Sequence, residues 1–360
     1  GGGLRNGASS ADLDASVGDV VAVDASLDAI VGSLTGALTY DRVPVAQDTN
    51  FGSRLDYDAT VPLPIRGCVV ALVADDSGAV LASTVTNDQG VYRFDEVSDR
   101  AVRLRVLAQT EQKEITVRDN TDDDALWVME SEPFEPYEVP RFDLHAASGW
   151  VNGAYRTPRI GAVFAMLDTF LSLHREVVEA VDLSPPGLTV FWSPSNVSID
   201  GDKRAGEIGT SHCMGTQIYL LGQADVDTDE YDVSVLGHEF GHYILATIGR
   251  GDGLGGGHED SELLDGRHAF EEGICDVFGA HASAPRSRYA DVIGDAQAQG
   301  WWTDYEDNLR SEFPTGWYAQ AAVSAITYDV MDDQDEAWDT ISLGMDGLWQ
   351  VMTGPMVEQE

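Results

Sequence analysis

The stretch HEFGH at residues 238–242 determines the predicted fold, because its two histidines have the spacing of one helical face. It lies within residues 233–248, whose apolar side chains predict a single buried helix. Both imidazoles can therefore reach one metal ion. Glu239 is the next residue round the helix, where it can take a proton from a metal-bound water. The spacing predicts a Zn2+ site with His238 and His242 as ligands and Glu239 as general base.

Two glycines, Gly237 and Gly241, lie inside this predicted helix, although glycine destabilises a helix interior by roughly 1 kcal/mol relative to alanine. Their four-residue spacing indicates that another backbone packs closely against that side. Residues 249–257 hold six glycines and are predicted to form an irregular loop beside the site.

A catalytic zinc ion needs a third protein ligand, and residues 269–279 offer candidates. This segment is predicted to be a second buried helix, in which Glu272 and Asp276 share a face. Buried carboxylates are costly without partners, so we expect one to bind the metal and the other to accept the second N–H of a ligand histidine. Glu271 lies about 100° further round the helix and is expected to contribute little. His268 is expected at the surface.

Together the two segments resemble the gluzincin metallopeptidases, thermolysin-like in arrangement, whose pattern is HExxH followed by (N/E)E(A/G)xSDxFG. Here the second part reads EEGICDVFG, at residues 271–279. The resemblance implies that His238, His242 and Glu272 are the zinc ligands. It also implies that Glu239 is the base and that Asp276 supports a ligand histidine.

The same resemblance implies how substrate would be held, because an edge strand in these enzymes pairs with the substrate backbone. Residues 217–221 would be that strand, with Gln217, Ile218 and Tyr219 as substrate contacts, and an interior strand is the alternative. These enzymes also carry a proton-donating residue, usually histidine, at the start of a late helix.

No histidine follows His281 in this chain. Residues 317–331 are apolar at helical spacing, and Tyr318 at the start of this segment is the candidate for the proton-donating role. Tyr328 and Tyr305 are the alternatives.

The chain is strongly acidic, with 62 Asp and Glu against 21 Lys and Arg in 360 residues and a formal charge of −41. This charge argues against a nucleic acid or an anionic membrane surface as partner. It favours a salt-rich habitat, where ions screen self-repulsion, and the alternative is an acidic secreted protein that binds several Ca2+ ions. Acid clusters at residues 200–202, 225–232 and 332–336 do not follow EF-hand spacing, so solvated surface is the favoured interpretation.

No apolar run approaches the length of a membrane span. The expected activity favours secretion or a cell-surface location, and the oligomeric state is left open. Cys68, Cys213 and Cys275 allow one disulfide without requiring it. Cys275, where the resembled family often has serine, is expected to be a small buried residue, with a thiolate ligand as the alternative.

Four successive segments are predicted along the chain. Residues 1–60 are a low-complexity leader or propeptide-like segment, and residues 61–120 hold short strands and turns typical of a small antiparallel β-sandwich. Residues 80–94 resemble carboxypeptidase-regulatory-like or prealbumin-like β-domains. Residues 121–149 read as an acidic, proline-containing linker, and residues 150–360 as the zincin-like domain.

The sequence therefore predicts an α+β protein, in which a zincin-like metallopeptidase domain with a mixed sheet and a mostly helical C-terminal lobe follows a small antiparallel β-sandwich. Its expected activity is zinc-dependent hydrolysis of a peptide or protein substrate, as an endopeptidase because no G-x-M-E-N motif for gripping a free N-terminus occurs. The alternative is a non-catalytic cell-surface adhesion protein with a structural zinc, which would not need Glu239 as a base.

Overall fold

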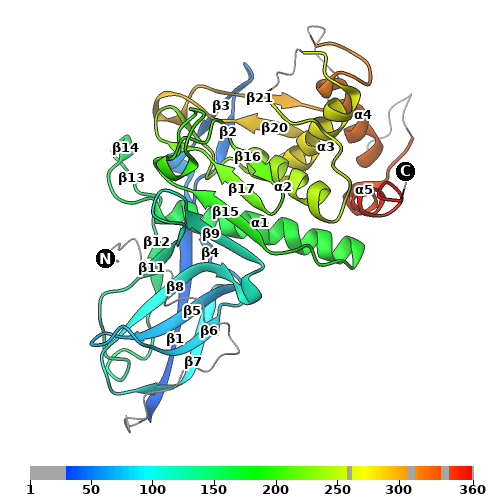
Figure 1. Ribbon diagram of the computed structural model, residues 1–360. Helices are drawn as coiled ribbons and strands as arrows, with labels where there is room; N and C mark the ends of the chain where they lie inside the picture. The colour runs from blue at the N-terminus through cyan, green and yellow to red at the C-terminus, as the bar shows by residue number, and fades with distance from the viewer. Residues whose placement is uncertain (1–29, 258–261, 307–312, 334–339, 359–360) are drawn as a thin grey trace. The chain divides into compact units, whose positions relative to one another are not determined.

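The computed structural model describes residues 30–257, 262–306, 313–333 and 340–358 (Figure 1). They form two compact units: the first comprises residues 30–44, 56–168 and 188–209, and the second comprises the remaining described residues. Each unit is thus assembled from separate stretches of chain, whereas the sequence suggested domains that follow one another. Residues 1–29 of the predicted leader lie outside the described residues.

The first unit contains a long strand where the sequence suggested only a leader. β1 (Ile30–Arg42) pairs with β4 (Val61–Pro64) and β7 (Val91–Ser98) in antiparallel fashion and with β12 (Leu144–Ala146) in parallel. Leu34, Leu38 and Tyr40 alternate toward the interior and are buried. This period-two burial is what a strand with one face on a core requires.

A second group of strands in this unit surrounds β5 (Cys68–Ala74), all of whose residues are buried. β5 pairs antiparallel with β6 (Val80–Val85) and β8 (Val102–Thr110), and β8 pairs with β9 (Ile115–Asp119) and β11 (Val128–Glu130). β9 also pairs with β10 (Ala125–Leu126) and, in parallel, with β15 (Leu188–Trp192). β13 (Trp150–Val151) and β14 (Ala154–Tyr155) form a separate hairpin.

The segment interpreted as a linker therefore contributes strands to the first unit. Trp127 and Met129 are buried, and Leu126 and Val128 belong to an apolar cluster with residues of β5 and β8. These strands were not predicted, because the apolar run is short and is flanked by acidic residues and prolines. The antiparallel strands expected within residues 61–120 are present, but their sheets also include strands from outside that range.

The second unit carries most of the helices. It includes the end of α1 (Ile160–Val181), followed by α2 (Val233–Thr247), α3 (Gly266–Ala282), α4 (Gln320–Met331) and α5 (Gly344–Thr353). One sheet has the order β2 (Val45–Gln47), β3 (Gly52–Leu55), β21 (Gly300–Asp304) and β20 (Arg288–Asp291). Two hairpins are β16 (His212–Met214) with β17 (Gln217–Leu220), and β18 (Gly222–Gln223) with β19 (Asp227–Thr228).

The described residues thus form a mixed α+β fold with several sheets and five α-helices. None of these helices combines the length and the apolar character that crossing a lipid bilayer requires.

α2 and α3 lie side by side, and glycines allow their close approach (Figure 1). A β-carbon at Gly237 would lie 2.8 Å from the carbonyl oxygen of Phe278, and one at Gly241 would lie 2.5 Å from its ring. Both glycines therefore face α3, which confirms the prediction of a second backbone on that side. Asp232 begins α2 by accepting a hydrogen bond from the Ser234 amide.

Candidate metal centre

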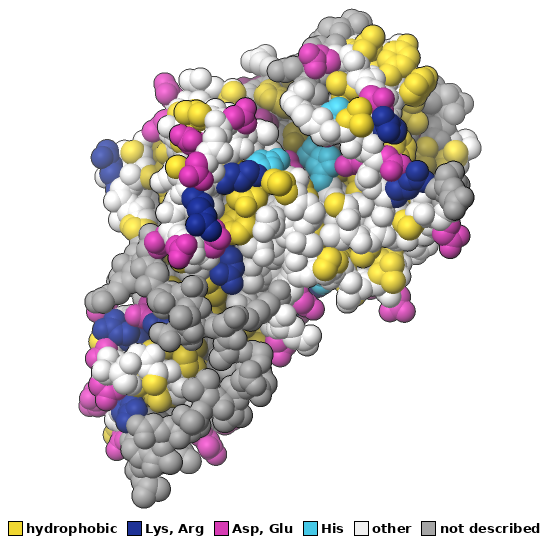
Figure 2. All heavy atoms as spheres, in the orientation of Figure 1, with side chains coloured by type: hydrophobic (Ala, Val, Ile, Leu, Met, Phe, Trp, Pro, Cys, Tyr) yellow, Lys and Arg dark blue, Asp and Glu magenta, His cyan; other side chains and the backbone are white. Residues whose placement is uncertain are grey.

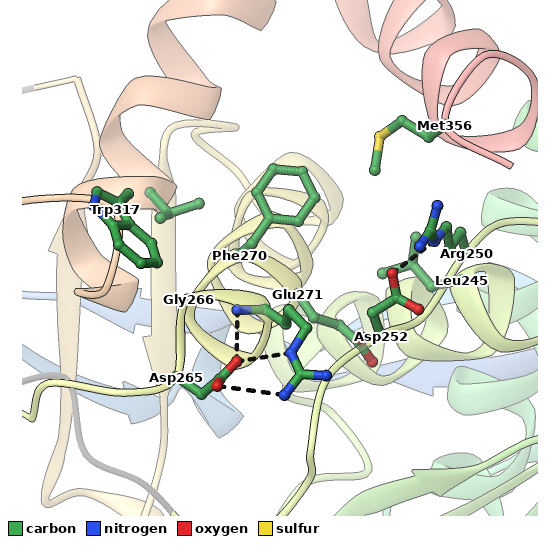
Figure 3. Close-up of a pocket in the computed structure, with 11 residues that line it drawn as sticks. Leu245, Arg250, Asp252, Asp265, Gly266, Phe270, Glu271, Trp317 and Met356 are labelled. Carbon is green, nitrogen blue, oxygen red and sulfur yellow. Dashed lines mark hydrogen bonds and ion pairs between the residues drawn. The ribbon is translucent and has the colours of Figure 1, made fainter. Parts of the chain in front are cut away.

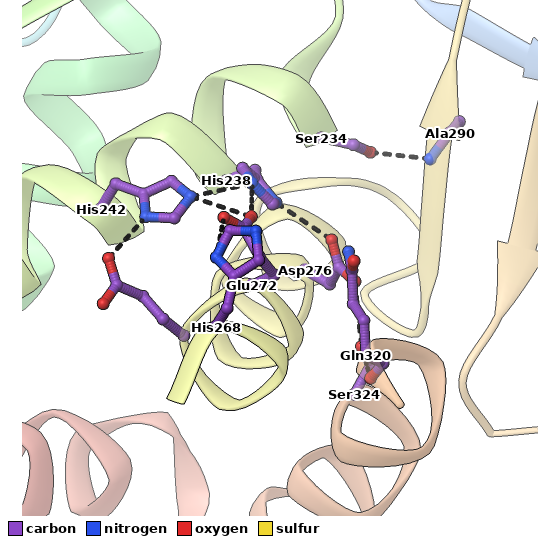
Figure 4. A network of polar contacts seen from close by, with 10 residues as sticks. Ser234, His238, His242, His268, Glu272, Asp276, Ala290, Gln320 and Ser324 are labelled. Carbon is purple, nitrogen blue, oxygen red and sulfur yellow. Dashed lines mark hydrogen bonds and ion pairs between the residues drawn. The ribbon is translucent and has the colours of Figure 1, made fainter. Parts of the chain in front are cut away.

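Three side-chain atoms from α2 and α3 converge in the second unit (Figure 4). His238 Nε2 and His242 Nε2 are 3.1 Å apart, and each lies 3.2 Å from Glu272 Oε2. Tetrahedral zinc, with ligands at about 2.0–2.1 Å, separates neighbouring ligand atoms by about 3.3 Å. The three predicted ligands thus form a triangle of the size that a zinc ion fits.

The charge balance of this triangle favours a positive charge. Burial alone would lower the pKa of His238, but its hydrogen bonds to Asp276 and Glu272 prevail and hold the pKa well above its usual range. Burial would raise the pKa of Glu272, but the hydrogen bonds from His238 and His242 hold it far below its usual range. The acids therefore stabilise positive charge between the rings, which either a protonated histidine or a bound cation would supply.

Asp276 fixes the orientation of His238. Its Oδ1 lies 3.0 Å from His238 Nδ1, while its Oδ2 accepts hydrogen bonds of 2.9 Å from Gln320 Nε2 and Ser324 Oγ on α4 (Figure 4). With a metal bound, a proton on Nδ1 would leave the Nε2 lone pair of His238 free to be the ligand. Asp276 therefore lies beside a histidine of the centre, as predicted, and α4 supplies two further contacts that no motif indicated.

Glu271 plays the same part for His242. Its Oε1 lies 3.2 Å from His242 Nδ1, and its Oε2 accepts a hydrogen bond of 2.6 Å from the Gly253 amide. The sequence did not predict this contact between Glu271 and His242. The long side chain of Glu271 spans the 100° of rotation that separates it from Glu272, so consecutive glutamates reach the same histidine from two sides.

His268 is buried, which contradicts the expected surface position. Its Nδ1 lies 3.6 Å from Glu272 Oε1, whereas the contacts of His238 and His242 given above are to Oε2. The four-residue spacing between His268 and Glu272 on α3 was the available signal, because it places both on one helical face.

Glu239 is buried beside the centre, with 6 % of its surface exposed. Its Oε2 has no hydrogen-bond partner among the described residues. Burial raises the pKa of the Cys213 thiol above its usual range, and the negative charge of Glu239 raises it further, so β16 lies close to this carboxylate. A buried, unpartnered carboxylate oxygen is available to accept a proton.

The predicted substrate strand corresponds to β17, but one edge of β17 is already paired with β16. His212, Cys213 and Met214 of β16 are opposite Tyr219, Ile218 and Gln217. β16 ends the strand order, and Ile218 is fully buried. The interior alternative for Gln217, Ile218 and Tyr219 therefore fits better, and the sequence missed β16 because it is three residues long.

The candidate tyrosines lie in different environments. Tyr318 precedes α4 and is 39 % exposed, with no contact to the three converging groups recorded among the described residues. Tyr305 and Tyr328 are buried. Tyr289 of β20 is near the centre instead, and its ring meets the His238 ring edge-on at 6.0 Å between centroids.

Cys68, Cys213 and Cys275 are all free thiols. Cys275 is fully buried, as expected, and it is not one of the three converging groups. His242 is partly exposed, so one side of the centre is accessible to solvent. Figure 2 shows where histidine side chains reach the surface on one face of the molecule.

A pocket of about 580 Å³ opens next to Glu271 (Figure 3). Phe270 and Trp317 supply apolar wall. The residues at its charged side form two local ion pairs, Arg250 with Asp252 at 2.6 Å and Arg267 with Asp265 at 3.0 Å. Glu271 thus contributes to the pocket and to the orientation of His242.

Models of known protein families do not match the chain, and no curated protein is significantly similar to it.

Proposed function

We propose that the protein is a zinc-dependent metallopeptidase of the gluzincin type that cleaves peptide bonds within a peptide or protein substrate. The observation that carries this proposal is the triangle of His238, His242 and Glu272 atoms with the Glu239 carboxylate buried beside it. Three ligands from two helices, with a base at the next position, are what metal-assisted hydrolysis requires.

The residues divide the work between ligand orientation and proton transfer. A zinc ion in this centre would lower the pKa of a bound water to about 7 and polarise the scissile carbonyl. Glu239 would take a proton from the attacking water and later pass it to the leaving amine. Asp276 and Glu271 would keep the Nδ1 protons in place, so that both Nε2 atoms remain ligands.

Substrate recognition would use the outer edge of β16 and the pocket beside Glu271. β16 lies next to Glu239 and ends its sheet, so an extended peptide could add to it as a further strand. Phe270 and Trp317 make the pocket suitable for an apolar side chain of the substrate.

The test compares two substitutions that should fail in different ways. Glu239→Gln keeps the shape but cannot accept a proton, so we expect activity on a generic peptide to fall by about 10²–10⁴ while one zinc per chain stays bound. Glu272→Ala removes a ligand, so zinc affinity and activity should fall together. Glu179→Gln, an exposed position on α1, is the matched control and should change neither.

Zinc is measured by elemental analysis after dialysis, and cleavage is measured with and without chelator. Full activity in both glutamate variants would refute the peptidase proposal. Retained zinc with no cleavage of any peptide by the unmodified protein would instead favour a non-catalytic protein with a structural zinc.

A further inference from the structure

Three aspartates outside the metal centre also bring their carboxylates together. Asp227 of β19, Asp229 and Asp291 of β20 each offer one oxygen, and these oxygens all lie within 4.8 Å of one another. The two stretches of chain are joined by an antiparallel bridge between Asp227 and Ile293, and the Gly294 amide donates to the Val226 carbonyl at 2.8 Å. This acidic cluster is therefore built by the backbone of the second unit.

The recorded neighbours of the cluster do not neutralise it. The Ser211 hydroxyl donates to Asp229, and the other groups that act on these carboxylates are backbone amides and further acids. Burial raises the pKa of Asp227 to about 7, with a further contribution from the charge of Asp291, and burial raises the pKa of Asp291 to about 6. When these three carboxylates are all ionised they repel one another, and their buried surroundings screen this repulsion poorly.

A fourth carboxylate, that of Asp232, gives independent support for a cation site. Asp232 is 0 % exposed, and its Oδ1 accepts a hydrogen bond from the Ser234 amide at 3.2 Å. Its Oδ2 has no partner among the described residues, and the same holds for Oδ1 of Asp227 and of Asp291. The Val292 amide acts on both Asp232 and Asp291, which brings the fourth carboxylate to the cluster. Buried carboxylate oxygens without donors are the ligands that a hard cation prefers.

We propose that Asp227, Asp229 and Asp291 bind a calcium ion, with Asp232 as a fourth carboxylate at the site. Calcium holds oxygens at 2.3–2.6 Å, so two ligand oxygens of one ion lie at most about 5 Å apart, and the three carboxylate oxygens are close enough to share one ion. The cluster offers no nitrogen or sulfur ligand, which separates it in chemistry from the histidine centre.

Calcium at this position would fasten β20 to the start of α2. Asp232 is the N-cap residue of α2, and Ser234 Oγ accepts a hydrogen bond of 3.0 Å from the Ala290 amide of β20 (Figure 4). β20 also carries Tyr289, whose ring packs against His238. The calcium site would therefore stabilise the strand that supports one zinc ligand, and it does not depend on peptidase activity.

The experiment uses the full chain, stripped of metals and reloaded with one equivalent of zinc, and titrates it calorimetrically with CaCl2 at pH 8 and constant ionic strength. We expect one calcium ion per chain, with a dissociation constant between about 10⁻⁶ and 10⁻³ M. Saturating calcium should raise the melting temperature by about 5 °C or more. Magnesium should bind more weakly, because its shorter bonds require a tighter cluster.

Asp229→Asn and Asp291→Asn remove one ligand charge each at constant shape, and each should weaken calcium binding by at least ~10-fold. Asp295→Asn is the matched control, since it removes an exposed charge four residues from Asp291 and should leave the affinity unchanged. Circular dichroism establishes that the variants fold. The proposal is overturned if calcium does not bind, if Asp295→Asn weakens binding equally, or if sodium at the same ionic strength gives the whole stabilisation.

Discussion

The metal centre and the acidic cluster lie in the same unit, but they differ in how their buried carboxylates are compensated. In the metal centre, both ligand histidines are backed by a carboxylate, Asp276 or Glu271, which is itself held by donors from α4 or the Gly253 amide. In the acidic cluster, several carboxylate oxygens have no donor among the described residues. One site is thus organised by the protein itself, whereas the other needs an ion or protons to balance its negative charge.

The largest predicted effect concerns pH and the acidic cluster. The folded pKa values of Asp227 and Asp291, about 7 and about 6, lie above the ordinary value of 3.8. Their protonated forms therefore stabilise the fold below pH 4, and this contribution is lost as the pH rises through 6 and 7. At about 1.4 kcal/mol per pH unit for each proton, calcium-free protein should lose a few kcal/mol of unfolding free energy between pH 5 and pH 8.

Chemical denaturation at several pH values measures this loss. Calcium should flatten the pH dependence, and so should Asp291→Asn. Equal slopes in the unmodified protein and Asp291→Asn would show that the two sites do not differ in the way described.

A smaller effect is expected from the support of His238. Asp276→Ala removes the acceptor for Nδ1 and leaves Gln320 and Ser324 without their shared partner, so zinc affinity should fall by about 10–100-fold. Competition with a chromophoric chelator measures the affinity. Asp346→Asn, an exposed position on α5, serves as the control. An unchanged zinc affinity in Asp276→Ala would mean that the protein does not organise the centre through this acid.

The smallest effect should come from Glu271. Glu271→Gln keeps an oxygen that can accept the His242 proton but loses the charge, and the side chain is partly exposed to screening solvent. We expect zinc affinity to fall by about 10-fold or less. The same chelator competition detects it, and Glu179→Gln is again the control. A loss as large as that of Asp276→Ala would show that both histidines depend equally on their acids.

The part of the site that could be predicted depends only on residue spacing within a single helix. His238 and His242, and likewise Glu272 and Asp276, are four residues apart, so helical geometry alone places each pair on one face. The contact of Glu271 was missed because a helical projection gives the direction of a side chain but not its reach.

Other features depend on pairing between distant segments, which one sequence does not encode locally. Asp291 follows Asp229 by 62 residues, so only the acidic stretch at residues 225–232 was visible as a candidate. β1 was missed because its inward positions include Gly36, which weakens the alternating apolar pattern.

The close contact between α2 and α3 has a consequence for how this protein can change through evolution. Gly237 and Gly241 carry no chemistry, yet any side chain there would collide with Phe278, whose ring is stacked on Trp349 at 4.0 Å. The two helices would have to separate, and the donors of α2 would move away from Glu272. Inheritance of the centre is therefore constrained at these two glycines as well as at the ligands, and a lineage that lost them would retain every reactive residue without their alignment.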